Sequence, residues 1–162
     1  MRSLSLCSGL AVITSLAVLG CGDTVIDGGK ATKFIGKTVT DQAGVRVKSV
    51  SCPDNVKAKK GGTFNCTVIA KDGTRGLVKV VQNDDKGNVR VSAPFLHMRE
   101  AEATIADQIK QQIKTDVTVT CPEIVVPVAG KTFNCEGSDG SKTRPIAVTL
   151  TDANGKFTFK VQ

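Results

Sequence analysis

Apolar and polar residues alternate with a period of two along several short segments of the chain. In one of them Phe64, Cys66 and Val68 share one face, and Asn65 and Thr67 share the other. This pattern is typical of antiparallel strands that have one buried and one solvated face. Links containing Gly separate the segments and suit hairpin turns. The pattern predicts two four-stranded meanders, over residues 45–52, 63–70, 75–83 and 88–93 and over residues 117–121, 131–137, 143–151 and 156–162.

An amphipathic helix is predicted before each meander, over residues 30–43 and 99–115. The first is the weaker one, because Gly36 lowers its helix propensity, and Gly44 is suited to end it. Each helix carries one apolar stripe that faces the sheet. The stripes consist of Phe34, Ile35, Thr38 and Val39 in the first helix and Ile105, Ile109 and Ile113 in the second. One helix packed on a four-stranded antiparallel sheet is an α+β unit.

The two units are copies of one another. Each contains Cys-Pro followed at the same distance by Thr-Phe-Asn-Cys, within residues 52–66 and again within 121–135. Repetition of this kind predicts tandem domains, and Phe64 and Phe133 are expected to fill the core beneath each helix. The chain then divides into a signal peptide at 1–20, a tether at 21–29, repeat 1 at 30–93, a linker at 94–98 and repeat 2 at 99–162.

The first twenty residues are typical of an export signal. Arg2 precedes a short apolar run that ends at Gly20 and Cys21, too short to cross a membrane comfortably. Residues 18–21 resemble a bacterial lipobox, in which the Cys becomes the lipidated first residue of the mature protein. An ordinary cleaved signal and a retained anchor are the alternatives. We therefore expect an exported lipoprotein that is held to a cell-envelope membrane through lipid on Cys21.

Four cysteines remain once Cys7 leaves with the signal and Cys21 carries the lipid. An even number in an exported chain favours disulfides. Four cysteines permit three pairings, and the repeat favours the one with a bridge inside each copy. The expected bridges are Cys52–Cys66 and Cys121–Cys135. A zinc site built from all four is the alternative, which the missing Cys-x-x-Cys spacing disfavours.

The composition disfavours several classes of function. Aromatic residues make up 4% of the chain and Trp and Tyr are absent, so stacking platforms for sugars or single-stranded nucleic acids are not expected. His97 is the sole histidine and reads as a packing or linker residue. The sequence contains no Ser-His-Asp spacing, calcium loop or phosphate loop. We expect no catalytic residue, no metal, no cofactor and no nucleic-acid partner.

The polar faces of the two sheets are the expected binding surface. Removal of the signal leaves 21 Lys and Arg against 15 Asp and Glu, a net charge of +6, which suits anionic lipids or acidic polymers as neighbours. The candidate residues are Asn65, Thr67, Arg90, Thr149, Thr151, Thr158 and Lys160. The expected function is a non-catalytic binding module for a protein or an acidic envelope polymer. A merely solvated face with scattered lysines is the alternative, as in a spacer lipoprotein without a ligand.

The motif Cys-Pro…Gly-x-Thr-Phe-Asn-Cys, placed after a helix and before a Gly-turned hairpin, resembles an uncharacterised domain family. The family, a domain of unknown function, occurs in bacterial envelope lipoproteins and membrane-tethered proteins, and the resemblance covers nearly all of residues 28–162 as two tandem domains. It implies the fold, the disulfides and the compartment, but no catalytic residue. In architecture alone, the layout is also similar to secreted protein inhibitors of β-lactamase, which pair two small helix-and-sheet repeats into a concave protein-binding surface. An inhibitor-like role is thus a further alternative.

Overall fold

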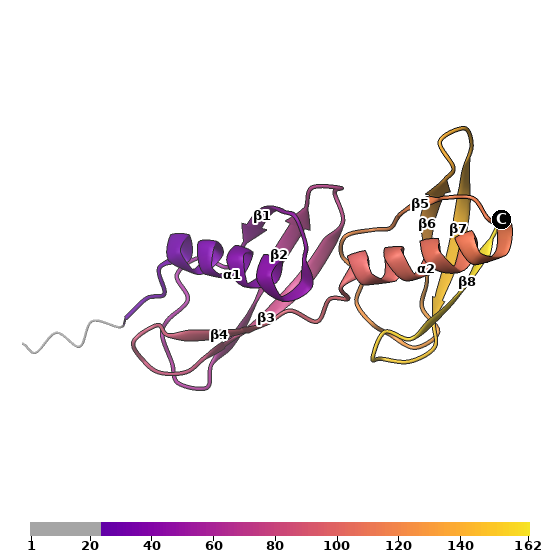
Figure 1. Ribbon diagram of the computed structural model, residues 1–162. Coiled ribbons are helices and arrows are strands. Elements are labelled where there is room, and N and C mark those ends of the chain that lie inside the picture. Colours follow the sequence, from indigo (N-terminus) through magenta and orange to yellow (C-terminus); the bar gives the residue numbers. More distant parts are fainter. Residues whose placement is uncertain (1–23) are drawn as a thin grey trace, which may run out of the picture.

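The structure is a computed structural model that describes residues 24–162 (Figure 1). The predicted signal peptide at 1–20 and Cys21 lie outside the described residues. Within them the chain forms two units of the same design, each a helix followed by a four-stranded antiparallel sheet. The predicted fold class, two tandem α+β repeats, is therefore confirmed.

Each sheet is a simple meander, in which strands that follow one another in the chain pair side by side. Repeat 1 consists of α1 Gly28–Ala43, β1 Val47–Ser51, β2 Thr63–Ala70, β3 Arg75–Gln82 and β4 Val89–Ser92. Repeat 2 consists of α2 Met98–Ile113, β5 Thr118–Thr120, β6 Thr132–Ser138, β7 Thr143–Leu150 and β8 Phe157–Val161. The two helices lie on the same side of the molecule, in front of the sheets that they cover (Figure 1).

The first helix has a defined start and end. The side chain of Asp27 accepts a hydrogen bond from the amide of Lys30 at 3.0 Å, which satisfies one of the free amides at the helix start. Gly44 adopts a left-handed conformation with φ 65° and donates its N–H to the carbonyl of Thr40. The predicted end of the helix at Gly44 is confirmed, because a residue without Cβ takes this conformation at little cost.

The apolar stripes of both helices are narrower than predicted. In α1 the buried residues follow one another at a spacing of four: Ala31, Ile35, Val39 and Ala43. Phe34 was expected on this stripe, but it lies beside it and is 47% exposed. Ile113 was expected on the stripe of α2 and is 57% exposed, because it occupies the last position of the helix. Ile105 and Ile109 are buried as predicted.

The alternation predicted for the strands is observed in β2 and β6, and it explains the disulfides. Cys66 and Val68 face the core of repeat 1. Ser51 pairs with Thr67 across β1 and β2, so Cys52 comes directly opposite Cys66, to which it is bonded. In repeat 2 the same register joins Cys121 to Cys135. Both predicted bridges are confirmed, and each connects neighbouring strands of its own sheet.

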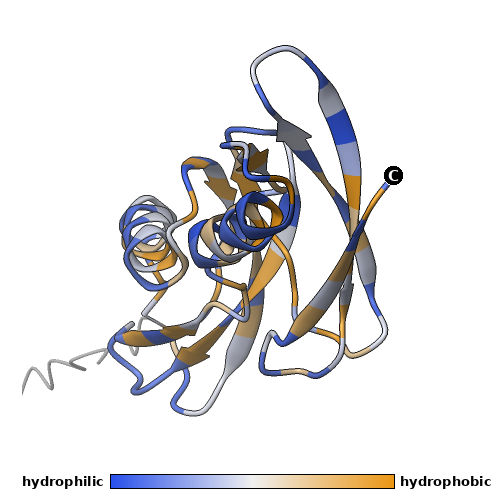
Figure 2. Cartoon of the chain, turned by 45° about the vertical axis from the view of Figure 1, so that its right-hand side comes forward, coloured by the Kyte–Doolittle hydropathy of each residue, from blue (hydrophilic) through white to orange (hydrophobic). Residues whose placement is uncertain are grey.

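The Phe residues of the two Thr-Phe-Asn-Cys motifs pack against the cores as predicted, although neither ring is fully covered. Phe64 contacts the core of repeat 1 and Phe133 that of repeat 2, and both are half-buried. The fully buried positions of the strands are instead filled by smaller side chains such as Val80 and Val148. Figure 2 shows the result, with apolar residues gathered in the strands behind two helices whose outer sides are polar.

The core of repeat 1 is completed by residues that come after it in the chain. Phe95, from the segment expected as a linker, is only 9% exposed and belongs to this core. Ile124, from the loop between β5 and β6, is 8% exposed and belongs to it as well. The two repeats therefore share apolar packing and do not behave as separate units on a flexible connection.

Gly76 in β3 provides the space for this packing. A Cβ atom at position 76 would lie 2.5 Å from the ring of Phe95 and 2.7 Å from the side chain of Ile124. Both distances are shorter than carbon atoms can approach one another. A hydrogen in place of a side chain thus creates a notch at the end of the sheet, and repeat 2 fills it.

Replacement of Gly76 by Ala should open the junction between the repeats. We expect the free energy of unfolding to fall by about 1–3 kcal/mol, because the extra methyl group overpacks the notch. The amides of Glu123 and Ile124, which donate to side chains of repeat 1, should exchange with solvent faster in hydrogen-exchange measurements. Gly28→Ala is the control, since a Cβ there meets nothing within 4 Å. Unchanged stability and exchange in Gly76→Ala would contradict the notch.

Candidate functional site

The outer face of the sheet in repeat 1 contains three of the predicted binding residues. Asn65 lies opposite Lys79, and Thr67 lies opposite Leu77, in the pairing of β2 with β3. Arg90 extends the same face on β4, and Asn65 and Arg90 are both exposed. The structure therefore brings these residues together on one solvent-facing surface, which we call the sheet-1 face.

The sheet-1 face also contains an apolar residue that the sequence reasoning missed. Leu77 is 60% exposed, although its neighbours Val78 and Val80 are fully buried. Arg75 and Lys79 lie on either side of it along the same face of β3. An exposed leucine between two cations offers both apolar contact and charge to a partner. The alternation along β3 was the signal that could have identified it.

The outer face of the sheet in repeat 2 is rich in threonine. The hydroxyl oxygens of Thr132 and Thr149 are 3.0 Å apart, and Thr149 lies opposite Thr158 on the next strand. Lys160 is exposed beside this row. Thr151 lies just beyond β7, where its amide donates to the carbonyl of Lys156 in the last turn. The predicted residues of repeat 2 thus form a second polar surface, the sheet-2 face.

The side chains of the two faces offer hydrogen bonds and positive charge. Among residues 24–162, no three or more His, Cys, Asp and Glu residues come together in a way that could hold a metal ion.

His97 lies at the start of α2 with its ring against the end of α1, since a Cβ on Gly44 would be 3.0 Å from the ring. This contact agrees with the packing role predicted for the histidine.

A polar network lies at the junction of the repeats, and sequence reasoning did not find it. Glu123 forms an ion pair with the guanidinium of Arg46 at 2.8 Å and accepts from its backbone amide at 2.7 Å. The amide of Glu123 donates to the carboxylate of Asp72 at 2.8 Å. The amide of Ile124 donates to the hydroxyl of Thr74 at 3.2 Å. These bonds connect the loop between β5 and β6 of repeat 2 to two parts of repeat 1, the turn between β2 and β3 and Arg46 just before β1.

A cleft of about 270 Å³ opens beside this network. Arg46 and Glu123 line it from one side, and Arg99 and Glu102 line it from α2. Glu102 accepts a hydrogen bond from the amide of Cys121 at 2.8 Å. Because both acids already serve the fold, the cleft acts as a part of the junction.

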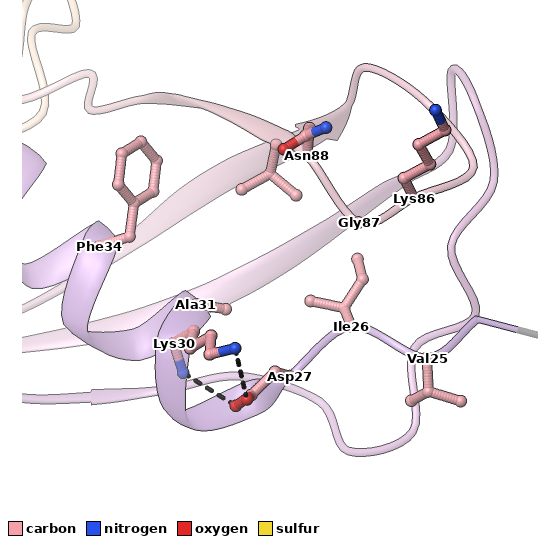
Figure 3. Close-up of a pocket in the computed structure, with 10 residues that line it drawn as sticks. Val25, Ile26, Asp27, Lys30, Ala31, Phe34, Lys86, Gly87 and Asn88 are labelled. Atoms are coloured by element: carbon pink, nitrogen blue, oxygen red, sulfur yellow. Dashed lines mark hydrogen bonds and ion pairs between the residues drawn. The ribbon is translucent and has the colours of Figure 1, made fainter.

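A larger groove, of about 430 Å³, lies at the other end of repeat 1. One wall is the start of α1, with Lys30 and Phe34, and the other is the loop between β3 and β4, with Lys86 (Figure 3). Ile26 points into the space between them (Figure 3), and Val25 completes the lining. We call this the α1 groove. Apolar side chains and two lysines line it, and the carboxylate of Asp27 lies 3.8 Å from the ammonium group of Lys30 (Figure 3).

The fold and these surfaces define a class, a tandem-repeat α+β protein with one disulfide in each repeat and polar outer faces. The chain belongs to the family described as a domain of unknown function, DUF4333, whose model matches residues 10–87 and 90–155. The two matches agree with the two repeats. No curated protein and no solved structure matches the chain. No helix within residues 24–162 combines the length and apolar character needed to span a membrane.

Asp72 and Asp139 test the polar part of the junction, because they occupy corresponding hairpin turns. Asp72 accepts from Thr74 within its turn, and Asp139 accepts from Ser141 and Lys142. Only Asp72 also accepts from the other repeat. Asp72→Ala should lower the free energy of unfolding by about 1–2 kcal/mol, as expected for a lost charged hydrogen bond, and Asp139→Ala should lower it less.

Both carboxylates should stabilise the protein in a pH-dependent manner. Although partial burial opposes the shift, hydrogen bonds from Thr74 and Glu123 hold the pKa of Asp72 below its ordinary value of 3.8. Bonds from Lys142 and Ser141 lower the pKa of Asp139 to about 2. A lowered folded-state pKa means that the stabilisation is complete above about pH 4 and is lost as the pH falls. Denaturant unfolding of the protein from pH 7 to pH 2 measures this loss of stability. At pH 7, equal losses of stability in Asp72→Ala and Asp139→Ala would contradict the contribution of the bond between Asp72 and the amide of Glu123.

Proposed function

We propose that the protein is a lipid-anchored cell-envelope protein that acts as a non-catalytic binding module. Its partner is a protein or an acidic envelope polymer, bound by the sheet-1 face together with the sheet-2 face. The observation that carries this proposal is the exposed row of Lys79, Leu77 and Arg75 on the sheet-1 face. The row pairs one apolar contact with cations on a surface that no described residue covers.

The rigid connection between the repeats supports a binding role. Docking of Phe95 and Ile124 into the notch at Gly76 holds the two sheets in a constant relation. Surfaces that are held in place before binding lose less conformational entropy when a partner binds. A spacer without a ligand has no need of such a junction, and a flexible linker would serve it equally well.

The proposed compartment is supported by the disulfides and by the start of the chain. Two disulfides are typical of proteins that fold in an oxidising, exported environment. The apolar run that ends at Gly20 and Cys21 matches the pattern of a lipoprotein signal. In the proposed protein, cleavage precedes Cys21 and lipid on this residue anchors the mature chain.

The anchor is tested by mass spectrometry of the protein isolated from membranes of an expressing bacterium. We expect a mature chain that begins with an acylated Cys21, in the membrane fraction. Cys21→Ser should leave the protein unacylated and shift it out of that fraction. An uncleaved chain, or one that begins with unmodified Cys21, would contradict the proposed anchor while leaving the binding faces untouched.

Binding is tested by capture from an envelope extract with immobilised fragment 22–162. We expect one stoichiometric partner, whose capture falls as salt rises because charge contributes to it. Lys79→Glu with Arg90→Glu should abolish capture. The control is Lys33→Glu with Lys114→Glu, which makes the same change of net charge on exposed residues of α1 and at the end of α2, outside both faces. Capture that is absent, or that falls equally in both variants, would contradict the proposal and favour the spacer.

A further inference from the structure

Positive charge is distributed very unequally between the two repeats. Residues 24–93 contain 13 Lys and Arg and 6 Asp, a net charge of +7, whereas residues 94–162 contain 8 Lys and Arg and 8 Asp and Glu, a net charge of zero. The net positive charge of residues 24–162 therefore lies entirely in repeat 1. The excess marks repeat 1 as the part that meets an anionic surface.

The charged repeat is the one next to the proposed anchor. Thr24 is the first described residue, and the chain enters repeat 1 at the end opposite to repeat 2 (Figure 1). Cys21 precedes Thr24 by three residues, which span at most about 11 Å when extended. Lipid on Cys21 therefore holds this end of repeat 1 against the membrane surface.

The segment before the helix can be compared between the two repeats, and in repeat 2 this segment contacts a neighbour. In repeat 2 the amide of Leu96 donates to the carbonyl of Val125, and in repeat 1 the amide of Ile26 donates to Val56, both at 2.9 Å. The residues before them, Phe95 and Val25, are thus equivalent. Phe95 is buried against repeat 1, but Val25 is 48% exposed. Repeat 1 therefore has a docking end that no described residue covers.

The α1 groove gives this end the composition of a membrane-binding surface. Phe34 on α1 is nearly half exposed and lines the groove with Lys30, one helical turn before it. Lys86 lies on the opposite wall (Figure 3). Apolar side chains bordered by lysines are typical of protein surfaces that enter the headgroup region of anionic bilayers.

We propose that the α1 groove end of repeat 1 docks on the surface of an anionic phospholipid membrane. Phe34 and Val25 enter the headgroup region and Lys86 binds lipid phosphate. Lys30 binds phosphate as well, in exchange for its solvent-exposed ion pair with Asp27. The proposal rests on the anchor at Cys21 for its orientation. It makes repeat 1 the membrane-contacting part and turns repeat 2 away from the bilayer.

The soluble fragment 22–162 and lipid vesicles test the docking without the anchor. The fragment is a complete folding unit, because both apolar cores and both disulfides lie within residues 24–162. It should sediment with vesicles of phosphatidylglycerol and phosphatidylcholine, and not with phosphatidylcholine alone. Binding should weaken as salt rises.

Matched variants locate the contact. Lys30→Glu with Lys86→Glu should reduce binding by at least about tenfold, as expected when two cations at a membrane surface are reversed. Lys131→Glu with Lys156→Glu makes the same change of net charge in repeat 2 and should leave most of the binding intact. Equal losses in the two double variants would overturn the proposal, since they would mean that net charge alone draws the fragment to the vesicles.

A fluorescent side chain tests whether the groove enters the lipid. The chain has no Trp, so Phe34→Trp introduces a single reporter. Its emission should shift to shorter wavelength when phosphatidylglycerol vesicles are added. Ile113→Trp, at an apolar position of α2 that is 57% exposed against 47% for Phe34, should not shift. Absence of a shift at position 34, or the same shift at both, would overturn the proposal.

The outcome is separate from that of the proposed binding function. Lys30→Glu with Lys86→Glu leaves the sheet-1 face intact and should capture the envelope partner normally. A fragment that binds no vesicles but captures a partner would refute membrane docking alone. A fragment that binds vesicles but captures nothing would refute the partner-binding role and leave the docking in place.

Discussion

The structure depends on the absence of a side chain at Gly76. Only a hydrogen leaves room for Phe95 and Ile124 at the end of the first sheet, and these residues close the core of repeat 1. A unit of this size buries little apolar surface by itself. The shared core and the disulfide in each repeat compensate for that small size, and the shared core also fixes the relation between the two outer faces.

The notch at Gly76 in repeat 1 has no counterpart in repeat 2. Val78 and Ile146 are equivalent, because each lies opposite the second Cys of its disulfide. Two positions earlier, repeat 1 has Gly76 and repeat 2 has Arg144. A head-to-tail contact can propagate only if each copy presents both of its surfaces. Arg144 occupies the notch position in repeat 2, so repeat 2 lacks the surface with which repeat 1 receives Phe95 and Ile124.

Local sequence patterns predicted the elements, the meanders and the disulfides, because these depend on periodicity and on the internal repeat. They could not predict which apolar residues with helical spacing remain exposed to solvent. Phe34 and Ile113 have helical spacing, but Phe34 lies beside the buried stripe of α1 and Ile113 is the last residue of α2, so both are about half exposed. The sequence contains one indication of the junction: the second copy has Ile124 at the position where the first copy has Asn55. An apolar residue that replaces a polar one in a loop indicates a neighbour, although it does not identify that neighbour.

Comparison of the two copies separates the residues that build a unit from those that connect it. Both copies retain the cysteines, the Phe of the motif and the Gly turns, and these residues form the fold of each unit. The copies differ at the ends, where Val25 corresponds to Phe95 and Gly76 to Arg144. Phe95 needs its large ring to fill a protein notch, whereas Val25 and the cations near it suit a surface that deforms and carries negative charge. The free end of repeat 1 therefore differs in composition from the docking end of repeat 2, and the proposed membrane contact rests on that difference.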